Sequence, residues 1–159
     1  MFDQVVSGGQ TGVDRAALDV ALELGMACGG WCPKGRIAED GRLASRYPLQ
    51  ETPSDDYAQR TDWNVRDSDG TLILSLGGLS GGTAQTVDVA DRVRKPYLVV
   101  DLANPPSVST VHAWATTHRV RIVNVAGPRE SKTPGIYALA SQFLRTLFAT
   151  VGRTHRARP

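Results

Sequence analysis

Along the chain, short continuous apolar runs alternate with stretches in which apolar residues recur at helical spacing. Val5 and Val6 form the first short run, and helical spacing then extends from Val13 to a stop at Gly25. The same criteria predict further strands at residues 27–32, 71–75, 96–102 and 120–125, and helices at residues 57–67, 81–93, 107–117 and 136–151. Apolar strands that alternate with helices are typical of a parallel sheet covered on both faces. We therefore expect an α/β fold, an open Rossmann-like three-layer sandwich with a mostly parallel sheet.

Three local features complete the expected organisation. Residues 36–56 contain Pro48 and Pro53 and show little periodicity, which predicts a long functional loop. The helix after this loop is expected to be capped by Ser54 or Asp55. The helix that begins at residues 81–83 is expected to turn four apolar side chains inward: Ala84, Val87, Ala90 and Val93.

Composition places the chain among ordinary globular proteins. Of the 159 residues, 41% are apolar and 21% charged, and two are cysteines. We expect one domain over residues 1–152 and a basic flexible tail over residues 153–159. No apolar run approaches the roughly 18 residues of a membrane span, and the N-terminus lacks the features of a signal peptide. We expect a cytoplasmic protein without membrane attachment.

The net charge of +2 comes from the tail, which holds three arginines. Without the tail, 15 basic residues stand against 16 acidic ones. A basic tail can touch nucleic acid, but a frayed, solvated terminus is the simpler interpretation. The charge therefore gives no reason to expect nucleic acid as a partner.

Three predicted strands end in loops rich in glycine or cations. The first loop, SGGQTG at residues 7–12, lets the backbone approach a ligand and aims a helix N-terminus at an anion. It matches neither the dinucleotide fingerprint nor the Walker motif, and a tight strand–helix turn is the alternative interpretation. The second loop, GGLSGGT at residues 77–83, holds four glycines in seven residues. The third, residues 124–132, contributes Arg129 and Lys132. Together they predict a phosphate or oxyanion site outside the carboxyl ends of the strands.

A polar helix face adds a candidate site for a flat heterocycle. Arg60, Trp63, Asn64 and Asp67 share one face of the helix over residues 57–67. The alternative is that Trp63 is a core or interface residue. Cys28 and Cys32 have no histidine nearby, so we expect small buried residues rather than zinc ligands.

Several motifs resemble the bacterial family of molybdenum carrier proteins. They are SGGQTGVDRA at residues 7–16, GWCPKG at 30–35, YAQRT at 57–61 with Asn64-Val65, DGT at 69–71, GGT at 81–83 and NVAGPRES at 124–131. The resemblance covers about residues 4–148. This family is grouped with a wider Rossmann-like set that includes the LOG phosphoribohydrolases, which release cytokinins, and the DNA-processing DprA proteins.

The resemblance implies a soluble, oligomeric protein that binds molybdenum cofactor, a pterin dithiolene with a terminal phosphate, and protects it or hands it on. Molybdoenzymes or cofactor-synthesis proteins are the partners it implies. Because the dithiolene sulfurs hold the metal, we assign no protein metal ligand. We also assign no catalytic residue. Lys34, Arg60 and Arg129 are expected to contact oxo groups without ligating the metal. The complete set expected to bind the cofactor is Gly8, Gly9, Gln10, Thr11, Gly12, Asp14, Lys34, Arg60, Asn64, Gly81, Gly82, Thr83, Arg129 and Ser131.

Two other functions stay open. A LOG-like hydrolase would cleave a nucleoside 5′-monophosphate between base and ribose, but Thr86 stands where that family's motif has its catalytic glutamate. Asp88 or Glu130 would serve only in a different geometry. Binding of single-stranded DNA, as in DprA, receives little support from an aromatic fraction of 6%. We expect binding rather than turnover.

Overall fold

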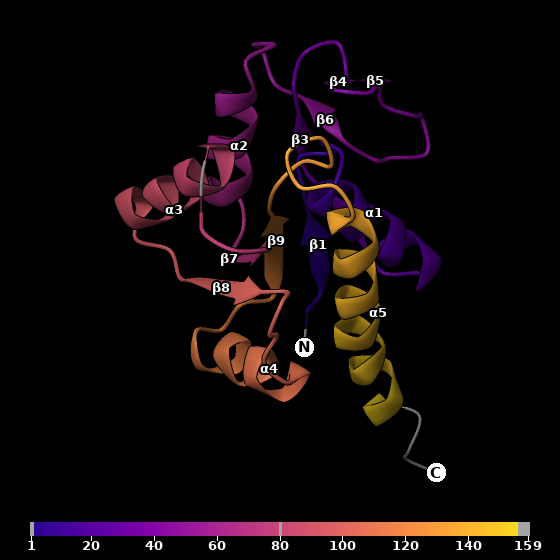
Figure 1. The fold of residues 1–159 in the computed structure, drawn as a ribbon, viewed down its shortest axis with the longest axis vertical. Helices are drawn as coiled ribbons and strands as arrows, with labels where there is room; N and C mark the ends of the chain where they lie inside the picture. Colours follow the sequence, from indigo (N-terminus) through magenta and orange to yellow (C-terminus); the bar gives the residue numbers. More distant parts are fainter. Residues whose placement is uncertain (1, 80, 156–159) are drawn as a thin grey trace.

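The structure is a computed structural model that describes residues 2–79 and 81–155 (Figure 1). Its main sheet has five strands in the order β2-β1-β9-β7-β8, and every pairing within it is parallel. These strands are β1 (Gln4–Val6), β2 (Cys28–Gly29), β7 (Gly70–Ser75), β8 (Tyr97–Asp101) and β9 (Ile122–Ala126). The helices are α1 (Val13–Glu23), α2 (Tyr57–Arg66), α3 (Gly81–Val93), α4 (Val108–Thr117) and α5 (Ile136–His155). The predicted α/β fold is confirmed.

Helices cover both faces of this sheet (Figure 1). Leu72 and Leu74 of β7 belong to the principal apolar core, which also contains the inner faces of α1, α4 and α5. Ile73, between them, points to the opposite face because side chains alternate along a strand. A smaller apolar cluster joins Val65 of α2 to Val89 of α3 on that side. A strand that is buried on both faces therefore reads as a continuous apolar run.

The strand expected at residues 27–32 divides into two short strands. Cys28–Gly29 pairs with β1, whereas β3 (Trp31–Cys32) pairs with β6 (Gln50–Glu51) in a separate small sheet. The change occurs at Gly30, whose φ of 128° favours glycine. The chain thereby leaves the main sheet and begins a separate layer.

The segment over residues 36–56 has more structure than a plain loop. It contains β6 and an antiparallel pair, β4 (Ile37–Ala38) with β5 (Gly41–Arg42). Its buried side chains Leu43, Tyr47 and Leu49 pack with Leu18 of α1 and with Cys32. This apolar cluster, the third of the fold, anchors the segment beside α1.

Two predictions about helices are wrong in detail. The N-cap of α2 is Asp56, whose carboxylate accepts from the Ala58 N–H at 2.9 Å, and neither Ser54 nor Asp55 occupies that position. On α3 the buried residues are Thr83, Thr86, Val89 and Ala90, so of the expected inner residues only Ala90 is buried. Val93 is 38% exposed. The buried face is rotated because α3 turns two threonines, rather than its valines, toward the cavity described below.

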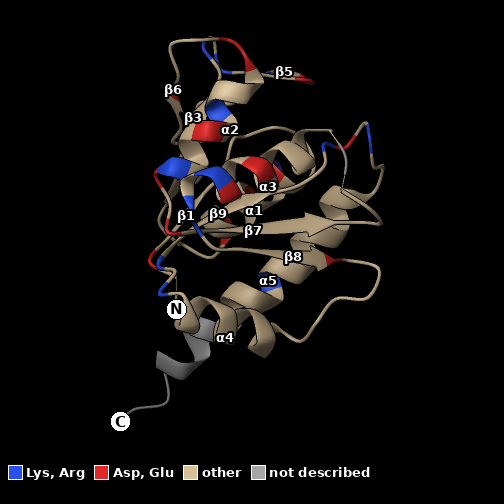
Figure 2. Ribbon diagram, turned by 90° about the vertical axis from the view of Figure 1, so that its left-hand side faces the viewer, with Lys and Arg blue, Asp and Glu red and all other residues tan. Residues whose placement is uncertain are grey.

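At the C-terminal end, α5 extends to His155 and thus into the segment expected to be a flexible tail. The rest of that tail, residues 156–159, lies outside the described residues. Within the described part of the chain, none of the helices is long and apolar enough to cross a bilayer. Both basic and acidic residues lie along α2 and α3 in Figure 2.

Candidate functional site

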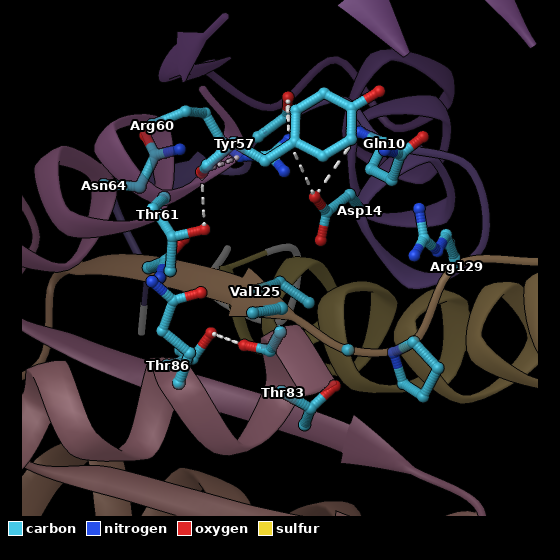
Figure 3. Close-up of a pocket in the computed structure, with 18 of the residues that line it drawn as sticks. Gln10, Asp14, Tyr57, Arg60, Thr61, Asn64, Thr83, Thr86, Val125 and Arg129 are labelled. Carbon is cyan, nitrogen blue, oxygen red and sulfur yellow. Dashed lines mark hydrogen bonds and ion pairs between the residues drawn. The ribbon is translucent and has the colours of Figure 1, made fainter. Parts of the chain in front are cut away.

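A cavity of about 420 Å³ lies at the carboxyl ends of β1, β9 and β7, beneath α2 (Figure 3). The three strands are far apart in sequence but adjacent in the sheet. The three loops singled out in the sequence follow these three strands, so the fold brings them to one place. The volume falls within the range of small-molecule sites.

Eight of the residues expected to bind a ligand line this cavity: Gly8, Gln10, Asp14, Arg60, Asn64, Gly82, Thr83 and Arg129. Six others do not line it: Gly9, Thr11, Gly12, Lys34, Gly81 and Ser131. The binding role of both groups stays a prediction.

The first loop uses several of its N–H groups internally. The Gln10 N–H donates to Asp14 Oδ2 at 3.4 Å, and the Thr11 N–H donates to Gln10 Oε1 at 3.0 Å. The Val13 N–H, at the start of α1, donates to the Pro128 carbonyl at 3.2 Å. At Gly12 a side chain would collide with that carbonyl. These bonds hold the first and third loops together and leave fewer donors for a phosphate than the motif suggested.

The start of α3 is more open than the first loop. A Cβ atom at Gly82 would meet no other atom within 4 Å, so the backbone there faces free space. Lys132 Nζ lies next to Gly81, 2.7 Å from where a Cβ atom would stand, and Lys132 and Arg129 both line the cavity. The helix N-terminus and two cations make this end of the cavity electropositive.

Glu39, in the segment over residues 36–56, occupies polar groups that were expected to bind the ligand. Its carboxylate accepts from the Thr11 hydroxyl and from the Ser131 hydroxyl and N–H, the latter two at 2.6 and 3.2 Å. Arg129 Nε lies 3.8 Å from Glu39 Oε2. The hydrogen bonds from Ser131 and Thr11 lower the pKa of Glu39. Thr11 and Ser131 thus hold this segment against the first and third loops.

The cavity also contains an ion pair that is almost buried. Arg60 Nη1 lies 3.7 Å from Asp14 Oδ2 and donates to the Gly8 carbonyl at 2.9 Å. The guanidinium also stacks over the Tyr57 ring at 5.1 Å. Asp14 is 8% exposed, and burial raises its pKa to about 6 although Arg60 and the Gln10 N–H act in the opposite direction. Asp14 holds the first loop in place through Gln10.

The aromatic residue at the cavity is Tyr57 rather than Trp63. Trp63 packs edge-on against Trp31, with ring centroids 4.7 Å apart, and does not line the cavity. Asn64 does line it, while its amide exchanges hydrogen bonds of 2.8 and 2.9 Å with the Trp31 backbone. The spacing 57, 60, 61, 64 identifies the correct face of α2 by the same helical rule that selected the face of Trp63.

Other residues that the sequence analysis missed include Thr86 and Asn124, which line the cavity. The Thr86 hydroxyl donates to the Gly82 carbonyl at 2.9 Å, and the buried Asn124 amide donates to the Thr71 hydroxyl at 3.3 Å. Thr86 was the position compared with the LOG glutamate, and Asn124 opens the third loop. Their cavity position depends on helix rotation and strand order, which no local signal supplies.

The acids considered for hydrolysis lie elsewhere. The Glu130 carboxylate accepts from the N–H groups of Gly135 and Tyr137 at 2.6 and 2.9 Å and so caps α5. Neither Glu130 nor Asp88 lines the cavity.

The two cysteines are set apart from the cavity as well. Cys32 packs in the core, Cys28 is half-buried, and burial raises the pKa of both thiols. Within residues 2–79 and 81–155, no group of three or more His, Cys, Asp or Glu side chains is placed to hold a metal ion.

A parallel sheet flanked by helices, with a cavity outside the carboxyl ends of neighbouring strands, defines a Rossmann-like α/β protein. Comparison with known proteins makes this class specific. Residues 5–148 match the circularly permutated YpsA SLOG family, and the chain belongs to that family.

A solved structure supports the same assignment. The crystal structure of the "Putative molybdenum carrier protein" from Syntrophus aciditrophicus SB is 45% identical, with a TM-score of 0.88 over 92% of this chain and 94% of that one. The resemblance to the molybdenum carrier family is thereby confirmed.

A curated relative matches a shorter stretch. The 5-amino-6-(D-ribitylamino)uracil–L-tyrosine 4-hydroxyphenyl transferase of Synechococcus elongatus is 42% identical over 64 residues, which cover 35% of this chain. The match spans 17% of the length of that relative.

Proposed function

We propose that this protein binds molybdenum cofactor as its cargo and hands it on, without chemical turnover. The observation that carries the proposal is the cavity itself, which is lined by two cations and by a buried acid close to an aromatic ring. A phosphate-bearing pterin has matching chemistry, with an anion at one end and a flat ring with polar edges at the other. The name of the 45% identical neighbour agrees with this ligand.

The phosphate is placed at the start of α3. Gly82 and Thr83 line the cavity there, and Arg129 and Lys132 supply positive charge. Charge-assisted hydrogen bonds of this kind contribute about 1.5–3 kcal/mol each. Arg60 is less suited to an oxyanion because it already contacts Gly8 and Asp14. The metal needs no protein ligand because the dithiolene sulfurs hold it.

The cation assignment has a matched control within the chain. Arg129→Ala and Lys132→Ala are expected to weaken cofactor binding by roughly 10- to 150-fold each. Lys34→Ala is expected to leave binding unchanged, because Lys34 does not line the cavity. Loss of molybdenum retention in Cys28→Ser or Cys32→Ser, with the cation variants unaffected, would establish direct thiolate ligation instead.

The deciding experiment identifies what copurifies with the native protein, by mass spectrometry and molybdenum analysis of the same preparation. A pterin phosphate together with molybdenum is the expected result. A nucleotide without molybdenum would contradict the proposal. A homo-oligomer that delivers its cargo to molybdoenzymes or cofactor-synthesis proteins in the cytoplasm belongs to the same proposal.

Turnover is tested separately. Incubation with AMP and related nucleoside monophosphates is expected to release no free base above a buffer control. Steady base release that disappears in Asp14→Asn but persists in Glu130→Gln would establish a hydrolase whose acid lies in the cavity.

A further inference from the structure

Asp14 has one carboxylate oxygen that the protein leaves unpaired. Its Oδ2 accepts from the Gln10 N–H and faces Arg60, whereas Oδ1 has no hydrogen-bond partner among the described residues. In Figure 3 the dashed lines meet one oxygen, and the other points away from Gln10 and Arg60 toward Val125. The side chain is 8% exposed and lines the cavity. An accessible acceptor atom on a nearly buried side chain therefore faces the space that a ligand would fill.

The chemistry of this acceptor restricts the ligand that meets it. A ligand that fills the cavity would cover this atom, and a covered acceptor without a donor is unfavourable, so a bound ligand is expected to present an N–H or O–H group there. Phosphate and oxo groups are repelled by the carboxylate and are attracted to Arg129 and Lys132. The Tyr57 ring, which also lines the cavity and contacts Arg60, provides an apolar face for a planar ring.

We infer that Asp14 Oδ1 accepts a hydrogen bond from an amino group on a heterocyclic ligand, and so selects amino-substituted rings over their oxo analogues. An oxo group at that position would set two acceptors against each other, and neither would have a donor. The inference rests on the proposed function only for the assumption that the ligand occupies this cavity. An amino-substituted purine would satisfy the inference as well as a pterin would.

The structure also fixes what Asp14→Asn would do. The Gln10 N–H and the Arg60 guanidinium both present donors to the Oδ2 position, so the asparagine oxygen is expected to occupy that position. The asparagine NH₂ then stands at the Oδ1 position, and an acceptor becomes a donor without a change of shape. The preference of the site is therefore expected to reverse, from amino toward oxo rings.

The test compares pterin with lumazine, which differs in carrying an oxo group in place of the 2-amino group. Binding is measured by calorimetry at pH 8 to the wild type, Asp14→Asn and Asp56→Asn. Asp56 is a matched control because it also lines the cavity but caps α2. The wild type and Asp56→Asn are expected to prefer pterin by about 10- to 100-fold, and Asp14→Asn is expected to prefer lumazine.

A second pair, AMP and IMP, carries the same exchange of amino for oxo on a purine. Preference for AMP without any pterin binding would uphold the role of Asp14 and overturn the proposed function. Pterin and lumazine binding with equal affinity would uphold the pterin site and overturn the role of Asp14. The inference also fails if Asp14→Asn keeps the wild-type preference, or if the wild type discriminates within neither pair.

Discussion

Asp14 couples the cavity to the stability of the fold. Its pKa in the folded protein is about 6, against 3.8 for an ordinary aspartate, because burial disfavours the ionised form more than Arg60 favours it. The folded state therefore binds this proton more tightly than the unfolded chain does. Stability is expected to fall as the pH rises from about 4 to 6, and the difference of two pKa units corresponds to about 3 kcal/mol.

Asp14→Asn tests this linkage because asparagine does not titrate. The free energy of unfolding of the variant minus that of the wild type is expected to grow by about 2.4 kcal/mol between pH 4 and pH 7. Urea denaturation of both proteins across that range measures it, and contributions from other groups cancel in the difference. Parallel curves for the two proteins would show that Asp14 titrates normally.

Gly82 provides the sharpest test of where the anion binds. A Cβ atom there meets no protein atom within 4 Å, so Gly82→Val is expected to project into the cavity and weaken ligand binding without loss of core packing. Gly78→Val is the matched control, because that position is equally open and does not line the cavity. Equal ligand affinity in both variants, measured by calorimetry, would move the anion site away from α3.

Gly9 does not provide such a test, although the first loop predicts a phosphate contact there. Its φ is +80°, and a Cβ atom would stand 2.7 Å from Leu49 and 2.9 Å from Leu43. Gly9→Val would therefore disturb the packing of the segment over residues 36–56 before it reported on a ligand.

At the scale of elements, that segment is held to the cavity loops by Glu39. The carboxylate joins β4 and β5 to the first and third loops through Thr11 and Ser131. The Thr11 and Ser131 groups that donate to Glu39 are donors of the kind that an anionic ligand uses. The Glu39 carboxylate and an anionic ligand would therefore compete for the same groups.

Glu39→Gln is expected to loosen the segment, because a neutral amide accepts weaker hydrogen bonds and loses its attraction to Arg129. Amide hydrogen exchange over residues 36–51 is expected to accelerate several-fold. The control is Glu23→Gln, which removes the Glu23–Arg145 ion pair between α1 and α5 and should leave this exchange unchanged. Unchanged exchange in Glu39→Gln would show that the apolar cluster around Leu43 alone holds the segment.

For the whole molecule, ligand binding and folding are linked by mass action. A ligand that binds only the folded state adds about 2.7 kcal/mol of stability at 100 times its Kd. For a chain of 159 residues this corresponds to a rise in Tm of about 5–10 °C. Thermal denaturation with pterin should show the rise, and Arg94→Ala, on the exposed turn after α3, should retain it in full. A Tm independent of pterin would rule out its binding at this affinity.

Assembly is a further property of the whole molecule. The predicted homo-oligomer stays a prediction, which light scattering on the purified protein would test.

The alternation of apolar runs and helical spacing was enough to identify the fold, because burial on both faces of a parallel sheet leaves a continuous apolar signal, as in residues 72–74. The loops after β1, β7 and β9 could also be identified from the sequence, because clusters of glycines and cations directly follow the predicted strands. The sequence did not show which face of each helix turns inward. In the structure, α3 buries Thr83 and Thr86, and α2 turns Tyr57 rather than Trp63 to the cavity. Both faces satisfy helical periodicity, and only packing selects between them.

By itself, then, the sequence determined the class of fold, the family and the three loops that meet at the cavity. Tertiary structure decided that β9 inserts between β1 and β7, which brings the loops together, because strand order is set by pairing between distant segments. It also decided which polar groups stay available. Thr11 and Ser131 donate to Glu39, and Arg60 pairs with Asp14, whereas Asp14 Oδ1 is left facing the cavity. The reason is that hydrogen-bond partners from distant segments meet only when the chain packs.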